Sequence, residues 1–120
     1  MQSTNNPKRG DIVQVRLSLV EGSEQAGERP ALVLSPDLIN EHSPVILVAA
    51  ITSKKVDRIY PFEVEVHPPE GGLTLRSKIL LMHIRSVDKR RLMGYYGHVT
   101  HQTMSKVEEA LKIATGLMPI

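Results

Sequence analysis

The chain has 120 residues, of which 41% are hydrophobic, which is enough for one domain with one core. Only 3% of the residues are aromatic, so we expect an aliphatic core, and the absence of cysteine excludes disulfides, thiolate metal sites and a cysteine nucleophile. The N-terminal segment has no apolar stretch, and no apolar run reaches membrane-spanning length, so we expect a cytoplasmic protein that does not contact membranes.

The net charge of +2 is unevenly distributed along the chain. Residues 1–50 hold four basic and six acidic side chains, whereas residues 51–91 hold nine basic and five acidic ones. A localised basic surface suits a polyanion such as nucleic acid, but charge alone favours the alternative of an ordinary solvated face. Eight of these nine basic residues fall in three groups, which are Lys54, Lys55 and Arg58, then Arg76 and Lys78, then Lys89, Arg90 and Arg91.

Most of the chain has the pattern of β-strands. Residues 12–19 begin with an apolar doublet and then alternate, and residues 62–66 alternate apolar with acidic side chains, so each segment predicts a strand with one buried face. Short apolar runs rich in β-branched side chains and bounded by prolines, typical of buried strands, are residues 31–34 and 45–51. After breaks at Pro68-Pro69 and Gly71-Gly72, two further apolar segments follow at residues 79–81 and 84–87.

Helical periodicity occurs only near the C-terminus. Thr100 can act as the N-cap of this helix, and Gly116 with Pro119 marks its end. The sequence therefore predicts a mainly β fold, in which one helix packs across a curled, mostly antiparallel sheet. We expect residues 8–120 to form this single domain and residues 1–7 to be a disordered tail. The apolar residues expected on the core side of the helix are Met104, Val107, Ala110, Leu111, Ala114 and Leu117.

Arg29 stands where a polar, glycine-containing loop leads into an apolar strand. Because Pro30 favours an extended backbone at the preceding residue and lacks an N–H, the pair marks the mouth of that strand. One interpretation is structural, with Arg29 paired to Glu24 or Glu28 so that it fixes the loop. The other is that Arg29 faces an anionic ligand.

A second strand, in the stretch "VAAITSK", ends in Thr52, Ser53 and Lys54. If this strand neighbours the one that begins at Arg29, a guanidinium, two hydroxyls and an ammonium converge on one concave site. These are the donors that can hold a phosphate and stabilise charge that develops on it. The pattern therefore favours the anionic-ligand interpretation of Arg29.

Four segments in order, "KRGDIVQVRL", "GSEQAGERPALVLS", "VAAITSK" and "SKILLMHIRSVDKRRL", resemble the MazF/PemK family of toxin endoribonucleases. The resemblance extends over about residues 8–117. It implies an SH3-like β-barrel of the MazF/PemK/CcdB toxin type with a C-terminal helix, assembled as a homodimer. It also implies sequence-specific, metal-independent cleavage of single-stranded mRNA without a cofactor, and neutralisation by a cognate antitoxin whose disordered segment occupies the RNA groove. Contact with DNA would occur only indirectly, through the antitoxin.

The family's catalytic arginine and threonine correspond to Arg29 and Thr52, and its RNA groove corresponds to the loop of Gly22, Ser23, Glu24 and Gln25 and to Ser53 and Lys54. His83 stands where similar relatives usually have glutamine, so it is either a groove residue or a partly buried histidine of the sheet. We also expect RNA contacts from Lys55, Lys78 and Tyr60, the last by stacking on a base. Lys89, Arg90 and Arg91 are interpreted as a solvated turn or a charge cluster at the dimer edge.

RNA carries its own nucleophile, so the expected reaction is attack by the 2′-hydroxyl, which leaves a 2′,3′-cyclic phosphate and a 5′-hydroxyl. Arg29 would stabilise the phosphorane, since a guanidinium stays charged and can contact two oxygens, and Thr52 would donate its hydroxyl to the same group. The resemblance also allows Arg29 to move the proton, although a guanidinium is a poor base at neutral pH. The histidine spacing does not resemble a metal site. The alternatives are a non-catalytic nucleic-acid-binding barrel and a gyrase-directed toxin of the same fold. The presence of both Arg29 and Thr52 favours cleavage.

Overall fold

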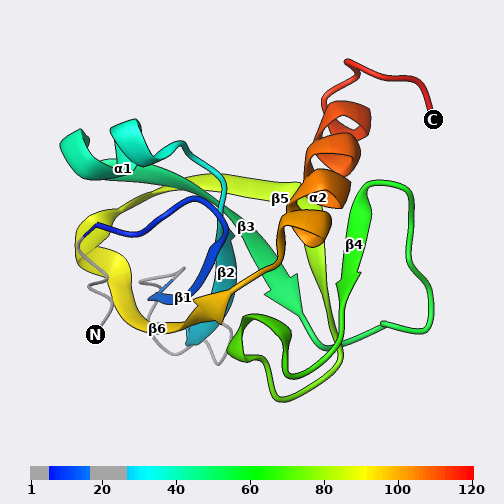
Figure 1. Ribbon diagram of the computed structural model, residues 1–120, viewed down its shortest axis with the longest axis horizontal. Helices are drawn as coiled ribbons and strands as arrows, with labels where there is room; N and C mark the ends of the chain where they lie inside the picture. Colours follow the sequence, from blue (N-terminus) through cyan, green and yellow to red (C-terminus); the bar gives the residue numbers. More distant parts are fainter. Residues whose placement is uncertain (1–5, 17–26) are drawn as a thin grey trace.

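The computed structural model describes residues 6–16 and 27–120, and within them the strands form one antiparallel sheet (Figure 1). The order across the sheet is β4-β5-β3-β2-β1-β6. Because the edge strands β4 and β6 do not pair in the described residues, the sheet is curled and barrel-like but not closed. The strands are β1 (Asp11–Arg16), β2 (Glu28–Val33), β3 (Val45–Thr52), β4 (Glu63–Val66), β5 (Ser77–Asp88) and β6 (Leu92–His98).

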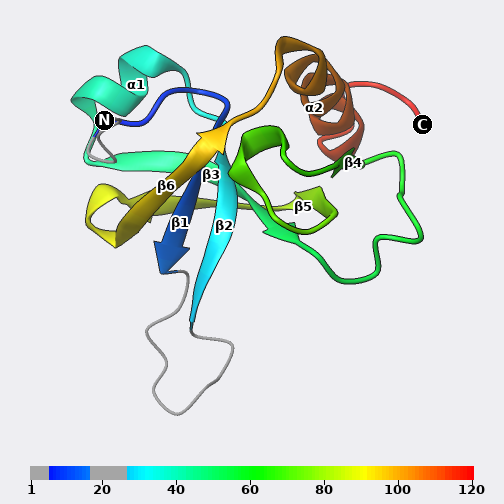
Figure 2. The same cartoon turned by 60° about the horizontal axis from the view of Figure 1, so that its bottom comes forward.

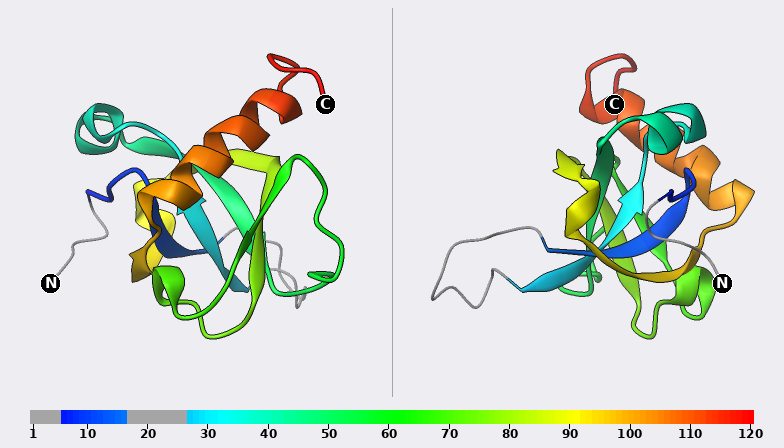
Figure 3. Two further views of the ribbon diagram at one scale, coloured as in Figure 1. Left: turned by 45° about the vertical axis from the view of Figure 1, so that its right-hand side comes forward. Right: turned by 90° about the vertical axis from the view of Figure 1, so that its left-hand side faces the viewer.

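The C-terminal helix α2 (His101–Ala114) crosses one face of the sheet, as Figure 3 shows. Thr100 caps it as predicted, since its hydroxyl oxygen accepts a hydrogen bond from the Thr103 N–H at 3.1 Å. Gly116 follows the last turn with a φ of +79°. Of the predicted core-facing residues Leu117 is wrong, because it lies beyond the end of the helix and is 80% exposed.

Alternation along the strands sends apolar side chains to both faces of the sheet. In β3, Ala49 and Ile51 belong to the core beneath α2, whereas Ile46 and Val48 belong to a smaller cluster on the opposite face. The core beneath α2 also includes Ile12, Leu32, Val64, Val66, Ile79, Leu81, Val99, Met104 and Val107. The smaller cluster is completed by Val13, Val15, Ala31, Val33, Val87 and Leu92.

Two elements were not predicted from the sequence. The helix α1 (Asp37–His42) is too short to show a helical period, and β6 has glycines and tyrosines without regular alternation. The apolar segments 79–81 and 84–87 are parts of the single strand β5, whose pairing with β3 shifts between Ala49 and Ala50. The extra β5 residues at this shift include His83, so a bulge joins the two segments.

Two short 3-10 turns complete the chain, η2 (Glu70–Gly72) and η3 (Lys89–Arg91). Figure 2 shows η2 beside the end of β6. No helix in residues 6–16 and 27–120 has the length and apolar character needed to cross a bilayer. Of the predicted 1–7 tail, residues 1–5 lie outside the described residues, and Pro7 is buried.

Candidate active site

Arg29 and Thr52 lie side by side at the ends of two paired strands. Strands β2 and β3 are antiparallel, with Ala31 paired to Ala50. Counting two residues outward along each strand from this pair reaches Arg29 on β2 and Thr52 on β3. Since residues two apart in a strand share a face, both side chains project from the same side of the sheet. The prediction that the strand beginning at Arg29 neighbours the strand ending at Thr52 is confirmed.

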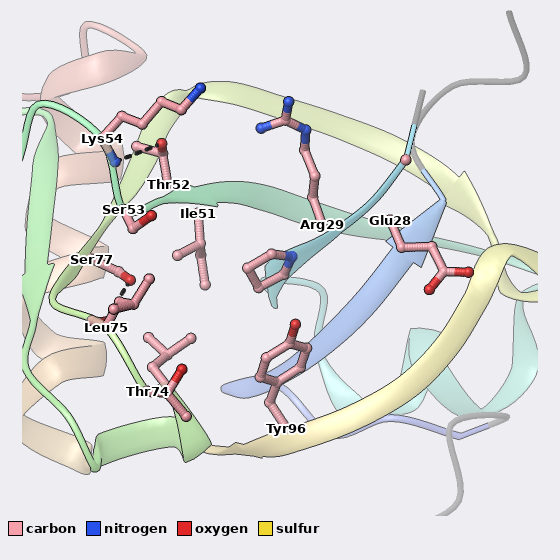
Figure 4. A pocket seen from close by; sticks show the side chains of 13 residues that line it. Glu28, Arg29, Ile51, Thr52, Ser53, Lys54, Thr74, Leu75, Ser77 and Tyr96 are labelled. Carbon is pink, nitrogen blue, oxygen red and sulfur yellow. Dashed lines mark hydrogen bonds between the residues drawn. The ribbon is translucent and has the colours of Figure 1, made fainter. Parts of the chain in front are cut away.

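Glu28 is one of the two predicted structural partners of Arg29. Its carboxylate points away from the Arg29 guanidinium (Figure 4) and lies 3.6 Å from the guanidinium of Arg16 on β1. Successive residues of β2 point to opposite faces, which accounts for this separation. Glu24, the other predicted structural partner, lies outside the described residues, as does the rest of the predicted groove loop, Gly22, Ser23 and Gln25.

A first hollow of about 340 Å³ opens beneath Arg29. In Figure 4 the polar ends of Arg29, Thr52 and Lys54 lie along one rim of it. Its other walls come from the segment after η2, from the start of β5 and from β6, which the sequence did not indicate as parts of this hollow. These walls include Leu73, Thr74, Leu75, Ser77 and Tyr96.

A second hollow, of about 580 Å³, adjoins the first. The two share Arg29, Ile51, Thr52 and Lys54, so these residues stand where the hollows meet. A third hollow of about 330 Å³ shares Lys55, Tyr60 and Lys78 with the second. The three hollows are therefore linked in succession by the residues that they share.

The turn after β3 orients the polar groups at this junction. The Thr52 hydroxyl oxygen accepts a hydrogen bond from the Lys54 N–H at 3.1 Å, which leaves the hydroxyl hydrogen for a ligand. Lys55 then adopts a φ of +56°, a left-handed conformation that is uncommon for a residue with a side chain. Ser53, Lys54 and Lys55, which the sequence analysis assigned to the RNA groove, are exposed.

Lys78 occupies a different position from the other predicted RNA-binding residues. Its ammonium is buried and donates hydrogen bonds to Glu63 Oε1 at 2.9 Å and to the Arg58 carbonyl oxygen at 3.0 Å. The same ammonium lies 5.9 Å from the centroid of the Tyr60 ring. Lys78 therefore supports the second hollow from within the fold.

Tyr60 is exposed at the edge of the second hollow, as a base-stacking residue should be. Its hydroxyl oxygen accepts a hydrogen bond from Arg58 at 3.4 Å, and this contact raises the pKa of Arg58 above its ordinary value. His83 lines the same hollow and is exposed. The interpretation of His83 as a partly buried sheet histidine is therefore wrong, because the β5 bulge turns it towards solvent.

The basic cluster Lys89, Arg90 and Arg91 lines none of the three hollows. Asp88 caps η3 and forms a hydrogen-bonded ion pair with Arg90, which lowers the pKa of Asp88. Among the residues that the structure describes, histidine, aspartate and glutamate side chains do not gather in threes that could hold a metal ion. His98 instead pairs with buried Asp11 at 2.8 Å, joining β6 to β1.

Residues 8–115 match the family model of the PemK-like, MazF-like toxin of type II toxin–antitoxin system. The chain is 43% identical over 111 residues to "Endoribonuclease EndoA" of Bacillus subtilis (strain 168), and the match covers 92% of this chain and 96% of that protein.

Solved structures of similar proteins have the same fold. The crystal structure of MazF (Form-I) from Deinococcus radiodurans matches with a TM-score of 0.74 at 31% identity, covering 92% of this chain and 96% of that one. An endoribonuclease in complex with its cognate antitoxin from a mycobacterial species matches with a TM-score of 0.78 at 28% identity, covering 93% and 97%. The predicted barrel-like fold with a C-terminal helix is thereby confirmed.

Proposed function

Because the chain belongs to the PemK-like, MazF-like toxins of type II toxin–antitoxin systems, we propose that it cleaves single-stranded mRNA with Arg29 and Thr52 as its catalytic residues. The observation that carries this proposal is the position of the two side chains. They come from the adjacent ends of two paired strands, share a face, and line both the first and the second hollow. A phosphate held there would have RNA on both sides of it.

In the proposed reaction the 2′-hydroxyl oxygen attacks the adjacent phosphorus and loses its proton, and the bond from phosphorus to the 5′-oxygen breaks. The leaving 5′-oxygen takes up a proton, so the products are a 2′,3′-cyclic phosphate and a 5′-hydroxyl. The Arg29 guanidinium can contact two phosphate oxygens at once and stays charged, which suits it to stabilise the phosphorane. The Thr52 hydroxyl, with its oxygen occupied by Lys54, donates to the same group.

The surroundings of the pair suit a single-stranded polyanion. Lys54 lines the first and second hollows, Lys55 lines the second and third, and Tyr60 offers an exposed ring. His83 and Arg85 add groups that can donate hydrogen bonds to bases or phosphates in the second hollow. We assign Ser53 and the Gly22 to Gln25 loop to the same RNA groove.

We further propose a homodimer in the cytoplasm, inhibited by a cognate antitoxin whose extended segment covers the groove. DNA would be contacted only through that antitoxin. Support comes from the family and from the similar mycobacterial endoribonuclease that was solved with its cognate antitoxin. Light scattering at micromolar concentration should give twice the 13.3 kDa chain mass, and a monomer mass would refute the dimer.

The decisive experiment is primer extension on a long RNA incubated with the purified protein in EDTA. We expect discrete cuts, and analysis of the ends should give a 2′,3′-cyclic phosphate and a 5′-hydroxyl. Strict dependence on added Mg²⁺ or Mn²⁺ would refute the proposed chemistry. A non-catalytic binding barrel would retain the RNA uncut, and a gyrase-directed toxin would leave RNA intact while inhibiting supercoiling.

A further inference from the structure

Two tyrosines occupy the two hollows that meet at Arg29 and Thr52. Tyr96 lines the first hollow and Tyr60 lines the second, and neither lines both. The two residues are 37% and 43% exposed, respectively, so each is partly open to a ligand and partly covered by the protein. Tyr60 follows β3 in the chain and Tyr96 belongs to β6, so the fold brings them to this site from separate segments.

The Tyr60 ring is held in place from several directions. It lies parallel to the Phe62 ring, with 5.5 Å between centroids and 2° between planes. Glu63 Oε1 accepts hydrogen bonds from both the Tyr60 N–H at 3.1 Å and the Lys78 ammonium at 2.9 Å. The Glu63 and Lys78 side chains are only 9% and 6% exposed. This buried ion pair therefore fixes the backbone and the ring of Tyr60, and a pre-positioned ring loses little conformational entropy on binding.

The Tyr96 ring points into the first hollow, across from Thr74 (Figure 4). Its position depends on a close approach between η2 and β6. A Cβ atom on Gly72 would overlap the Tyr96 carbonyl oxygen, and one on Gly97 would overlap the backbone of Gly71. Two chain segments that approach this closely leave Tyr96 little freedom to shift along the wall.

We propose that Tyr60 and Tyr96 each stack on one of the two bases that flank the scissile phosphate, one base on the 5′ side and the other on the 3′ side. This inference rests on the proposed function, since it needs the phosphate at Arg29 and Thr52. The two hollows adjoin on either side of Arg29 and Thr52, so the nucleotides on the two sides of a phosphate held there can each enter one of them. Each hollow offers a ring beside apolar side chains, Leu75 in the first and Leu80 in the second. Glu63 and Lys78 are positioning residues for Tyr60.

The test uses one oligonucleotide with a single cut site, in which the nucleotide immediately 5′ or 3′ of the cut is replaced by an abasic one. Fluorescence anisotropy measures binding of a form with 2′-deoxyribose at the cut, which cannot be cleaved. For the wild-type protein each abasic replacement should weaken binding roughly five- to 150-fold, the usual range for loss of one base–aromatic stack. In the Tyr60→Leu variant, an abasic replacement on one side of the cut should no longer weaken binding, while the replacement on the other side still does. In the Tyr96→Leu variant the two sides should be exchanged.

Tyr95→Leu is the matched control, because Tyr95 is a similarly exposed tyrosine of β6 that lines none of the three hollows, and it should keep both losses. Lys78→Met should reduce the loss of binding only for the abasic replacement that is also affected by Tyr60→Leu. Lys78→Arg can keep the ion pair with Glu63, so it should retain that loss of binding. Unchanged losses in both leucine variants, or disappearance at the same position in both, would overturn the proposal. If the wild-type protein shows both binding losses but leaves the all-ribose strand uncut, stacking is supported and the proposed cleavage fails.

Discussion

Arg29 and Thr52 each stand two residues beyond the paired Ala31 and Ala50, on adjacent antiparallel strands. This register places a guanidinium and a hydroxyl at the junction of two hollows, although 22 residues separate them in the chain. A shift of one residue in the register of either strand would move the corresponding side chain to the other face of the sheet. The pairing of β2 and β3 therefore determines the relative position of Arg29 and Thr52.

Replacement of Arg29 by alanine should abolish most cleavage of a defined oligonucleotide while binding weakens far less. Arg29→Lys should rescue poorly, because one ammonium cannot reproduce the two-pronged guanidinium contact. Single-turnover cleavage and thermal unfolding should be measured on the same preparations. An arginine that only fixed the loop would give the opposite result, a stability loss of about 0–1 kcal/mol with nearly normal cleavage.

Thr52→Val keeps the β-branched shape and removes only the hydroxyl. Loss of one donor to a developing oxyanion costs about 2.7–4 kcal/mol, so we expect single-turnover cleavage to slow by a factor on the order of 100 to 1,000. Thr74→Val is the matched control, since Thr74 lines the first hollow but is not shared with the second. Equal effects of the two substitutions would show that Thr52 has no special role.

Glu63→Gln should destabilise the fold, because it leaves the buried Lys78 ammonium without its carboxylate. Breaking a buried ion pair costs about 3–5 kcal/mol, measured as a fall in the free energy of urea unfolding. Glu108→Gln removes the partner of Arg9 in a more exposed pair and should cost only about 0–1 kcal/mol. The double variant Glu63→Leu with Lys78→Met should recover much of the loss, since no charge is then left unpaired.

Gly72→Ala should reduce both stability and cleavage. The residue has a φ of +75°, and its Cβ would overlap the Tyr96 carbonyl oxygen, so η2 must move away from β6. Gly116→Ala is the control, because Gly116 has a comparable φ of +79° and a Cβ there would meet nothing within 4 Å. Its effect on the free energy of unfolding therefore gives the conformational penalty alone, about 1–2 kcal/mol. If thermal unfolding shows the same loss in both variants, the close contact with β6 is not important.

Glu70 makes stability depend on acidic pH. Burial raises the pKa of its carboxyl, but hydrogen bonds from Thr103 and Thr100 outweigh this and lower the pKa overall. A lowered pKa in the folded state stabilises the ionised protein above the unfolded value of about 4.3, and this stabilisation is lost as the pH falls through the folded value. Thermal unfolding from pH 7 downward should therefore show a steeper decline for wild type than for Glu70→Gln, which does not titrate. Parallel curves would contradict this.

Local patterns in the sequence predicted much of the fold. Alternation and short apolar runs indicated β1 to β4, and the Thr100 cap, with apolar residues at helical spacing, indicated α2. These signals are local, since each depends on residues within a few positions of one another. The helix α1 and strand β6 lack such a signal, and their positions follow from packing on the rest of the sheet.

The sequence by itself determined which residues form the polar ends of β2 and β3, and hence Arg29, Thr52 and Lys54. Only the tertiary structure decided that Tyr96 and the segment after η2, which includes Leu75, form the far wall of the site. The same is true of Lys78, which lies inside the fold with Glu63. The reason is physical. A strand end is specified by neighbours in sequence, whereas a wall depends on the close approach of η2 to β6 and a buried charge depends on its partner across the sheet. Those contacts join distant segments, and their geometry is fixed when the sheet curls and α2 packs against it.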